Sequence, residues 1–154
     1  MRSELDAKAV VCSISSDAHT WNLVYLQLLL EDLGFDVRNL GACTEVADLM
    51  KLCRTEPPVL VVLSTVNGHG HIEGPAYAGA VRSLPGCRDT KVVIGGKLGI
   101  DGAGDQYTAA LLAAGFDAVF SPGEAELARF REDVAPLART GTRHARIPTP
   151  TEVT

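Results

Sequence analysis

The sequence has few aromatic residues, no excess of basic residues and no long apolar run. These shortages argue against two classes of function, nucleic-acid binding and membrane insertion. Aromatic side chains make up 5% of the 154 residues, and the formal net charge is -5, with 14 basic against 19 acidic residues. Nucleic-acid binding usually relies on aromatic stacking and a basic surface, so we do not expect it here. No apolar segment approaches the ~20 residues that cross a bilayer, and the first residues lack a signal-peptide pattern.

The sequence also lacks the common metal, redox and nucleotide motifs. Its four cysteines, Cys12, Cys43, Cys53 and Cys87, form no C-x-x-C pair. Cys12 lies in an apolar run and is expected in the core, and unpaired cysteines indicate the reducing cytoplasm. No G-x-G-x-x-G opens the first crossover and no P-loop is present, which disfavours an ordinary dinucleotide or nucleoside triphosphate site.

Apolar runs and amphipathic segments alternate five times along the chain. This alternation predicts an α/β fold with a doubly wound, five-stranded parallel sheet, flavodoxin-like or Rossmann-like, in the order 2-1-3-4-5. Thr44 is expected to cap the second helix, and Gly34 and Gly115 to end the first and fourth. Residues 1–138 should form this domain, and residues 139–154, rich in Thr, Arg and Pro, a disordered tail. Strands are predicted over residues 9–15, 35–40, 59–63, 91–95 and 118–120, and helices over residues 20–33, 45–54, 72–84, 105–114 and 124–137.

The loops after the first and third strands are expected to form a ligand site, because the strand order changes direction between those strands. Asp17-Ala18-His19 follows the first strand, Ser64-Thr65-Val66 the third and Gly95-Gly96 the fourth. A histidine backed by a carboxylate is typical of a metal ligand. Small residues at neighbouring strand ends leave a slot for a bulky group. Together these residues suggest a corrin cofactor whose cobalt is reached by His19.

Each motif has a plainer interpretation as well. Asp17 could cap the following helix and leave His19 merely exposed, and Ser64 could satisfy a neighbouring backbone group. The histidines of residues 67–71 could join His19 in a transition-metal site, although a mobile loop is the favoured interpretation. A receiver domain would need aspartate where Ser64 stands, and a flavodoxin would need a phosphate loop that residues 15–17 match poorly.

Taken together, the motifs resemble those of the cobalamin-binding domain family, whose pattern is D-x-H-x-x-G, then S-x-L, then G-G. The chain has D-A-H-T-W-N at residues 17–22, S-T-V at residues 64–66 and G-G at residues 95–96. Within the family it resembles the small subunits of glutamate mutase (methylaspartate mutase), through residues 34–41, 68–73 and 121–123. Two positions depart from the pattern, because Asn22 replaces the glycine and Val66 replaces the leucine.

The resemblance implies that cobalamin binds base-off, with His19 replacing dimethylbenzimidazole as the lower cobalt ligand. Asp17 would bond the other imidazole nitrogen, and the displaced nucleotide tail would pass between the sheet and its helices. No catalytic residue is expected in this chain alone. The residues that the resemblance assigns to the cofactor are Ser16, Asp17, His19, Asn22, Ser64, Val66, Gly95, Gly96, Lys97, Pro122 and Gly123.

The implied activity is an isomerase reaction, the adenosylcobalamin-dependent rearrangement of L-glutamate to 3-methylaspartate. The resemblance places the substrate in a larger, barrel-type partner subunit, in a cytoplasmic heterotetramer with no nucleic-acid or membrane partner. Two alternatives stay open: a stand-alone cobalamin carrier or sensor, and a degenerate domain that serves as a protein-interaction module.

Overall fold

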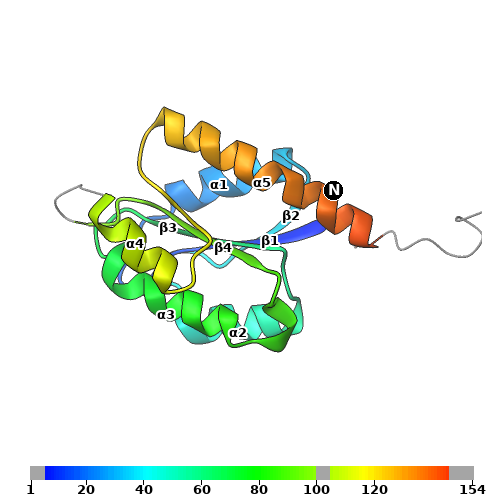
Figure 1. Cartoon of the computed structure of the whole chain (residues 1–154), viewed down its shortest axis with the longest axis horizontal. Coiled ribbons are helices and arrows are strands. Elements are labelled where there is room, and N and C mark those ends of the chain that lie inside the picture. The colour runs from blue at the N-terminus through cyan, green and yellow to red at the C-terminus, as the bar shows by residue number, and fades with distance from the viewer. Residues whose placement is uncertain (1–5, 100–104, 146–154) are drawn as a thin grey trace, which may run out of the picture.

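A computed structural model describes residues 6–99 and 105–145 and contains a parallel sheet with helices on both faces (Figure 1). The five strands lie in the order β2-β1-β3-β4-β5, as predicted. The strands are β1 (Ala7–Cys12), β2 (Phe35–Asn39), β3 (Leu60–Thr65), β4 (Lys91–Gly96) and β5 (Ala118–Phe120). The helices are α1 (Trp21–Asp32), α2 (Val46–Thr55), α3 (Gly70–Arg82), α4 (Asp105–Ala113) and α5 (Glu124–Ala145), with a 3₁₀ turn, η1 (Pro85–Cys87).

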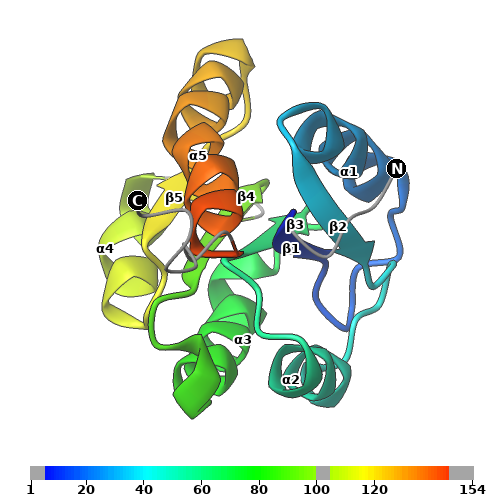
Figure 2. The same cartoon turned by 90° about the vertical axis from the view of Figure 1, so that its right-hand side faces the viewer.

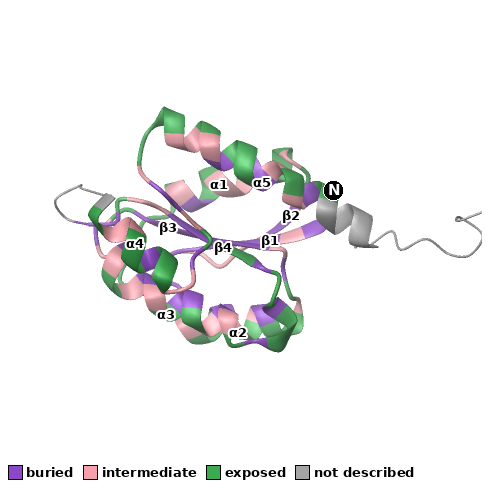
Figure 3. Ribbon diagram, viewed as in Figure 1, coloured by how far each residue is buried: buried purple, intermediate pink, exposed green. Residues whose placement is uncertain are grey.

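The sheet separates two helical layers. Helices α1 and α5 cover one face, and α2, α3 and α4 cover the other (Figures 1 and 2). Successive side chains of a strand point to opposite faces, so Val61 and Leu63 of β3 join the core under α2 and α3. Leu60 and Val62 join the core under α1 and α5. Strand β3 is buried along its whole length, as expected for a central parallel strand, whereas the outer faces of the helices are exposed (Figure 3).

The carboxyl ends of the parallel strands meet along one edge of the sheet. Residue Ser64 of β3 is paired with Gly95 of β4, and Thr65 is paired with Gly96. Cys12, the last residue of β1, is paired with Leu63 on the other side of β3. This register brings three segments that lie far apart in the sequence to one place, as the topology argument requires.

Several predicted boundaries shift by a few residues. Strand β1 ends at Cys12, so residues 13–15 belong to the following loop. Strand β3 continues through Thr65, so Ser64 lies in the strand rather than after it. Helix α3 begins at Gly70, two residues before its predicted start. Gly34 and Gly115 end α1 and α4 as predicted, with φ angles of 107° and 121° that favour glycine.

The prediction that Thr44 caps α2 is wrong. The N-cap residue is Glu45, whose side chain makes no capping hydrogen bond. The Thr44 hydroxyl instead accepts the Ser13 amide at 3.0 Å and donates to the Gly41 carbonyl at 2.7 Å. The Thr44 hydroxyl is therefore bonded to the loops that follow β1 and β2 rather than to the first turn of α2.

Helix α5 runs to Ala145, past its predicted end near residue 137 and through Pro136. It therefore takes in residues 139–145, the first part of the predicted disordered tail. The rest of that tail, residues 146–154, lies outside the described residues. Within the described ranges, no helix combines the length and apolar character needed to cross a membrane.

Cys12 is fully buried in the core, as predicted, and packs in the same cluster as Cys53 and Cys87. Burial raises the pKa of the Cys12 thiol, and it raises the pKa of Cys53 to about 12, with the neighbouring Cys87 adding to the effect. Both side chains therefore remain neutral thiols at physiological pH and act as small apolar residues.

Candidate functional site

The centre of the candidate site is Asp17, a fully buried carboxylate in the loop after β1. One carboxylate oxygen accepts the backbone amides of Val66 and Asn67, at 2.6 and 3.2 Å. The other accepts the His19 backbone amide at 3.1 Å and lies 2.7 Å from Nδ1 of the His19 ring. Asp17 thus joins the loop after β1 to the end of β3, across about 50 residues of sequence.

Burial of the carboxyl alone would raise the pKa of Asp17. The hydrogen bonds from the Val66 amide, the His19 ring and backbone, and the Asn67 amide outweigh burial and hold this pKa below its ordinary value. The carboxylate is therefore ionised at neutral pH and able to fix the tautomer of the imidazole beside it.

His19 presents its ring to solvent from this anchored position. Its side chain is 60% exposed, and Nδ1 is the nitrogen held by Asp17. The Nδ1–H donates to the carboxylate, which leaves Nε2 as the nitrogen that can bind a metal. The alternative in which Asp17 caps α1 does not hold, because the N-cap residue is Thr20 and no side chain caps this helix.

We expect Asp17→Asn to lower the free energy of unfolding at pH 7 by about 2 kcal/mol, because an amide NH₂ would face backbone N–H donors that now meet a carboxylate. The Asp17 pKa is depressed by folding, so its stabilisation is present above the ordinary aspartate pKa of about 3.9 and is lost as the pH falls through the lowered folded value. Urea unfolding followed by circular dichroism from pH 7 to pH 2.5 measures the difference.

The exposed Asp89 supplies the matched control, Asp89→Asn, which should change stability little at any pH. A gap between the wild type and Asp17→Asn that stays constant down to pH 2.5 would contradict the role given to the Asp17 charge.

A second set of polar contacts holds the Asp17 loop against α3. The hydroxyls of Ser15 and Ser16 each donate to a carboxylate oxygen of Glu73, the first of them at 2.9 Å. The Asn67 side-chain amide donates to the Ser16 hydroxyl at 2.9 Å. Ser16, which the sequence assigns to the site, therefore acts on the position of the loop through Glu73.

His69 and His71 do not join His19. Nδ1 of His71 lies 2.7 Å from the Leu98 carbonyl, and the His71 ring stacks on Tyr107 with centroids 4.0 Å apart. Nδ1 of His69 lies 3.9 Å from Glu73. Among the described residues, no three histidine, cysteine, aspartate or glutamate side chains gather where they could hold a metal ion. The alternative of a multi-histidine metal site is therefore wrong for this part of the chain.

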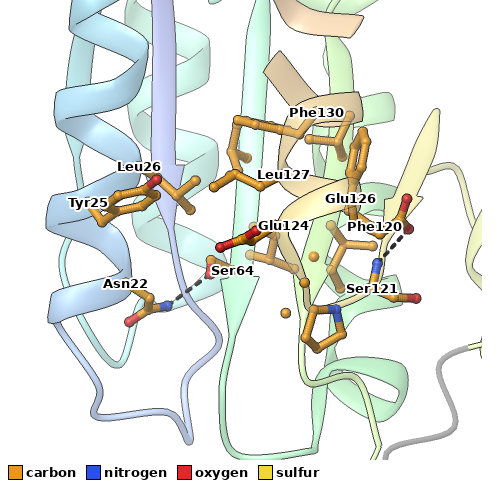
Figure 4. A pocket seen from close by; sticks show the side chains of 18 of the residues that line it. Asn22, Tyr25, Leu26, Ser64, Phe120, Ser121, Glu124, Glu126, Leu127 and Phe130 are labelled. Carbon is orange, nitrogen blue, oxygen red and sulfur yellow. Dashed lines mark hydrogen bonds between the residues drawn. The ribbon is translucent and has the colours of Figure 1, made fainter. Parts of the chain in front are cut away.

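A pocket of about 640 Å³ opens beside this loop, between α1 and α5 and above the ends of β3, β4 and β5 (Figure 4). Its size falls within the ~300–1,000 Å³ typical of small-molecule sites, and apolar side chains dominate its wall. Six predicted site residues line it: Asn22, Ser64, Gly95, Gly96, Pro122 and Gly123. Three more, Ser16, Asp17 and His19, belong to the adjoining loop described above.

Val66 and Lys97 lie just past the ends of β3 and β4 and are not among the pocket-lining residues. Val66 contributes its backbone amide to Asp17, and the Lys97 amide donates to the Thr65 carbonyl at 2.9 Å. Both residues therefore shape the edge of the site through the backbone.

The sequence did not predict the helical walls of the pocket. Trp21, Tyr25 and Leu26 form the α1 side, and Leu127 and Phe130 belong to the α5 side. The sequence did contain one signal for this wall, because α1 carries apolar residues both on the face that packs on the sheet and elsewhere around the helix. Trp21 and Tyr25 are 82% and 52% exposed, and exposed apolar side chains that gather on one helix commonly mark a binding surface.

Across the pocket mouth, α1 and β3 are joined by a side-chain hydrogen bond. The Asn22 amide nitrogen donates to the Ser64 hydroxyl at 2.9 Å (Figure 4). The amide oxygen of Asn22 is buried, and within the described residues it has no hydrogen-bond partner. The plainer interpretation, in which Ser64 bonds a neighbouring backbone group, is therefore wrong. Its hydroxyl is bonded to the side chain of Asn22, which stands where the motif has glycine.

Gly96 of β4 is required by the fold itself, and Gly95 beside it leaves little space for a side chain. Gly96 has a φ of 98°, and a Cβ there would lie 2.1 Å from the Thr65 carbonyl oxygen. A Cβ on Gly95 would meet the Cβ and carbonyl oxygen of Phe120 at 3.3 Å. Both positions therefore keep β4 close to its neighbouring strands at the pocket edge.

The loop after β5 is fixed by a charged pair on α5. Glu126 accepts the Ser121 amide at 3.0 Å and two guanidinium nitrogens of Arg129. The hydrogen bonds from Arg129, with that from Ser121, lower the pKa of Glu126 to about 2. Arg129 also donates to the Val119 carbonyl at 2.6 Å and lies over the Phe120 ring. This arrangement holds Pro122 and Gly123 at the pocket.

Comparison with known proteins gives consistent matches. The model of the B12 binding domain family matches residues 7–131. The chain is 32% identical over 122 residues to the glutamate mutase sigma subunit of Halobacterium salinarum, covering 77% of this chain and 79% of that subunit. It is 27% identical over 117 residues to the glutamate mutase sigma subunit of Fusobacterium nucleatum, covering 75% of this chain and 85% of that one.

Among solved structures, the fold resembles a cobalamin-binding protein from Desulfitobacterium hafniense DCB-2, with a TM-score of 0.64 and 21% sequence identity. That match covers 88% of this chain but 58% of the other, so the chain spans a little under three fifths of that structure.

Proposed function

Because the chain belongs to the B12-binding domain family, we propose that it is the small, cobalamin-binding subunit of an adenosylcobalamin-dependent glutamate mutase. The observation that supports this best is the exposed His19, anchored by buried Asp17 in the loop that precedes the pocket-lining residues Trp21 and Asn22. The curated relatives, which are glutamate mutase sigma subunits, favour the same assignment. The reaction would be the rearrangement of L-glutamate to 3-methylaspartate.

The residues present fit a corrinoid with a histidine lower ligand. A single imidazole whose Nδ1 is bonded to a carboxylate suits a corrinoid, because the corrin ring itself would supply most of the metal's ligands. In this proposal Nε2 of His19 would bind the cobalt, and Asp17 would orient the ring and increase its basicity. When bound, the adenosylated cofactor supplies radical chemistry, while the chain contributes binding, orientation and electronic tuning.

The pocket fits the nucleotide tail that such a binding mode displaces. It lies beside the His19 loop and reaches between the sheet and helices α1 and α5. Apolar side chains such as Leu26 and Phe130 would cover the base, and the backbone of Gly95 and Gly96 allows close approach. Insertion of the tail would remove the apolar pocket surface from water. This burial would add to the affinity that the cobalt–histidine bond provides.

The substrate would bind to a larger, barrel-type subunit, in a cytoplasmic heterotetramer. The name of the curated relatives, a sigma subunit, supports the existence of such a partner. The chain alone would bind the cofactor without turning over glutamate.

Titration with adenosylcobalamin and hydroxocobalamin tests the proposal directly. Trp21 is the sole tryptophan and lines the pocket, so bound corrinoid should quench most of the intrinsic fluorescence. The visible spectrum should shift toward that of a histidine-ligated, base-off corrinoid, and the pigment should remain with the protein through gel filtration. Addition of a large mutase subunit and L-glutamate should then yield 3-methylaspartate.

Absence of both quenching and retained pigment would contradict cobalamin binding. Retained pigment without 3-methylaspartate, in the presence of an active large subunit, would instead favour a carrier or sensor.

A further inference from the structure

The turn that carries Asp17 is buried at both ends and exposed at its tip. The Asp17 backbone amide donates to the Ile14 carbonyl at 3.1 Å, which closes a β-turn. Ile14 and Asp17 are fully buried, whereas Ser15 and Ser16 at the tip are exposed. His19 follows the turn by two residues, so a movement of the turn also displaces the imidazole.

A single carboxylate from another element holds this tip. Glu73 lies in the first turn of α3, and its side chain is 25% exposed. One carboxylate oxygen accepts the Ser15 hydroxyl at 2.9 Å, and the other accepts the Ser16 hydroxyl. A carboxylate has two oxygens and can accept from two donors at once. Glu73 therefore fixes both tip residues against α3 with one side chain.

The loop after β3 reaches the same turn. The Asn67 side-chain amide donates to the Ser16 hydroxyl at 2.9 Å, and the Asn67 backbone amide donates to the Asp17 carboxylate at 3.2 Å. The Ser16 oxygen accepts from Asn67 while its O–H donates to Glu73. The His69 ring, 3.9 Å from Glu73, is too far away for a hydrogen bond. Glu73 is thus the acceptor that the two tip hydroxyls share.

The position of Glu73 on α3 has a plainer explanation. A carboxylate in the first turn of a helix is stabilised by the helix dipole and can accept the free amides there. The N-cap residue of α3, His69, makes no capping hydrogen bond with its side chain, so the helix end does not receive a side-chain cap from that residue. Both oxygens of Glu73 are nevertheless bonded to the turn. The direction of this side chain is therefore explained by the turn rather than by α3.

We propose that Glu73 is a positioning residue, which keeps the turn in the conformation from which His19 can bind cobalt. This inference rests on the proposed function, because it concerns the lower ligand of the cofactor. Asp17 sets the tautomer and direction of the imidazole, whereas Glu73 sets the place of the turn. The apparent affinity of a site falls with the fraction of molecules in which the site is correctly formed. Without Glu73 the tip hydroxyls would bond water instead, and that fraction should fall.

The test removes each side of this contact and follows the binding of hydroxocobalamin to the full chain. Glu73→Ala removes the shared acceptor, and the double variant Ser15→Ala/Ser16→Ala removes the donors and leaves α3 unchanged. Glu73→Gln keeps the length of the side chain and one acceptor oxygen. Glu132→Ala, which removes an exposed carboxylate from α5, is the matched control. Circular dichroism confirms that each variant is folded, and the serine variant carries the test if Glu73→Ala does not fold.

Each variant is also made in the His19→Ala background, because a residue that acts through His19 should matter only when His19 is present. With His19 present, we expect Glu73→Ala and the serine variant to weaken binding about tenfold. In the His19→Ala background the same changes should weaken it by less than about twofold. The bound corrinoid should also lose part of the spectral change of histidine ligation. Glu73→Gln should recover most of the affinity, and Glu132→Ala should bind as the wild type does.

An equal loss of affinity in the two backgrounds would mean that Glu73 supports the fold alone, and it would overturn this proposal. A Glu73→Ala variant that binds as tightly as the wild type, with an unchanged spectrum, would overturn it as well. Both outcomes leave the proposed function standing, because the wild type still binds the corrinoid through His19. A wild type that binds no hydroxocobalamin would overturn the proposed function and this proposal together.

Discussion

Replacing His19 with alanine should lower the affinity for hydroxocobalamin by about 100-fold and abolish the spectral change of histidine ligation. Even outer-sphere partners of metal ligands account for ~10–100-fold in affinity, so loss of the ligand itself should reach at least the upper end of that range. The effect on stability should be small, because His19 is 60% exposed and Asp17 keeps its bonds to Val66 and Asn67. The experiment is the visible titration, with urea unfolding as the check on folding.

His69→Ala is the matched control for this variant. His69 lies in the loop after β3, is 44% exposed and is 3.9 Å from Glu73, so it resembles His19 in exposure and in having a carboxylate nearby. It should bind hydroxocobalamin as the wild type does. Equal affinity and equal spectra for His19→Ala and the wild type would refute cobalt ligation by His19.

Gly96→Ala should lower the free energy of unfolding by about 4 kcal/mol, the largest stability effect expected of a single substitution here. Its φ of 98° is strained for any residue with a Cβ, which costs ~1–3 kcal/mol. The new Cβ would also lie 2.1 Å from the Thr65 carbonyl oxygen, and overpacking adds ~1–3 kcal/mol. The carbonyl cannot move aside without loosening its hydrogen bond from the Lys97 amide.

Gly79→Ala serves as the control for Gly96→Ala. Gly79 is exposed on α3, and a Cβ there would meet nothing within 4 Å. Alanine should stabilise the helix by up to about 1 kcal/mol. Both variants are compared by urea unfolding with circular dichroism. A loss of less than about 1 kcal/mol in Gly96→Ala would mean that the Thr65 carbonyl yields, and that glycine is not required by the fold.

The order of the sheet and the nearness of Asp17 to His19 could be predicted from the sequence, because both depend on local signals. Five apolar runs separated by helical segments fix the strand count, and short right-handed crossovers restrict the order. Asp17 and His19 are two residues apart, so their contact needs no knowledge of the rest of the chain. The helix ends at Gly34 and Gly115 were predicted correctly, because tolerance of a positive φ is a property of glycine itself.

The pocket wall and the contact between Asn22 and Ser64 could not be predicted in the same way. The distance between α1 and α5 depends on how both helices pack on the sheet, and no short motif encodes it. The Asn22–Ser64 bond joins residues 42 positions apart. The failed prediction for Thr44 has the same cause, because its hydroxyl bonds the Ser13 amide, 31 residues away, instead of the adjacent end of α2. Contacts between distant segments decide these details.

The shortness of β5 and the contacts of Arg129 also bear on how the molecule resists aggregation. A parallel sheet has two open edges, and an uncovered edge strand can pair with another chain. Here β5 has three residues, and Arg129 occupies the carbonyl of Val119 in its middle. On the other edge, β2 carries the charged pair Asp36–Arg38 at 3.0 Å. Neither edge is a good template for a further strand, so self-association through added strands is disfavoured.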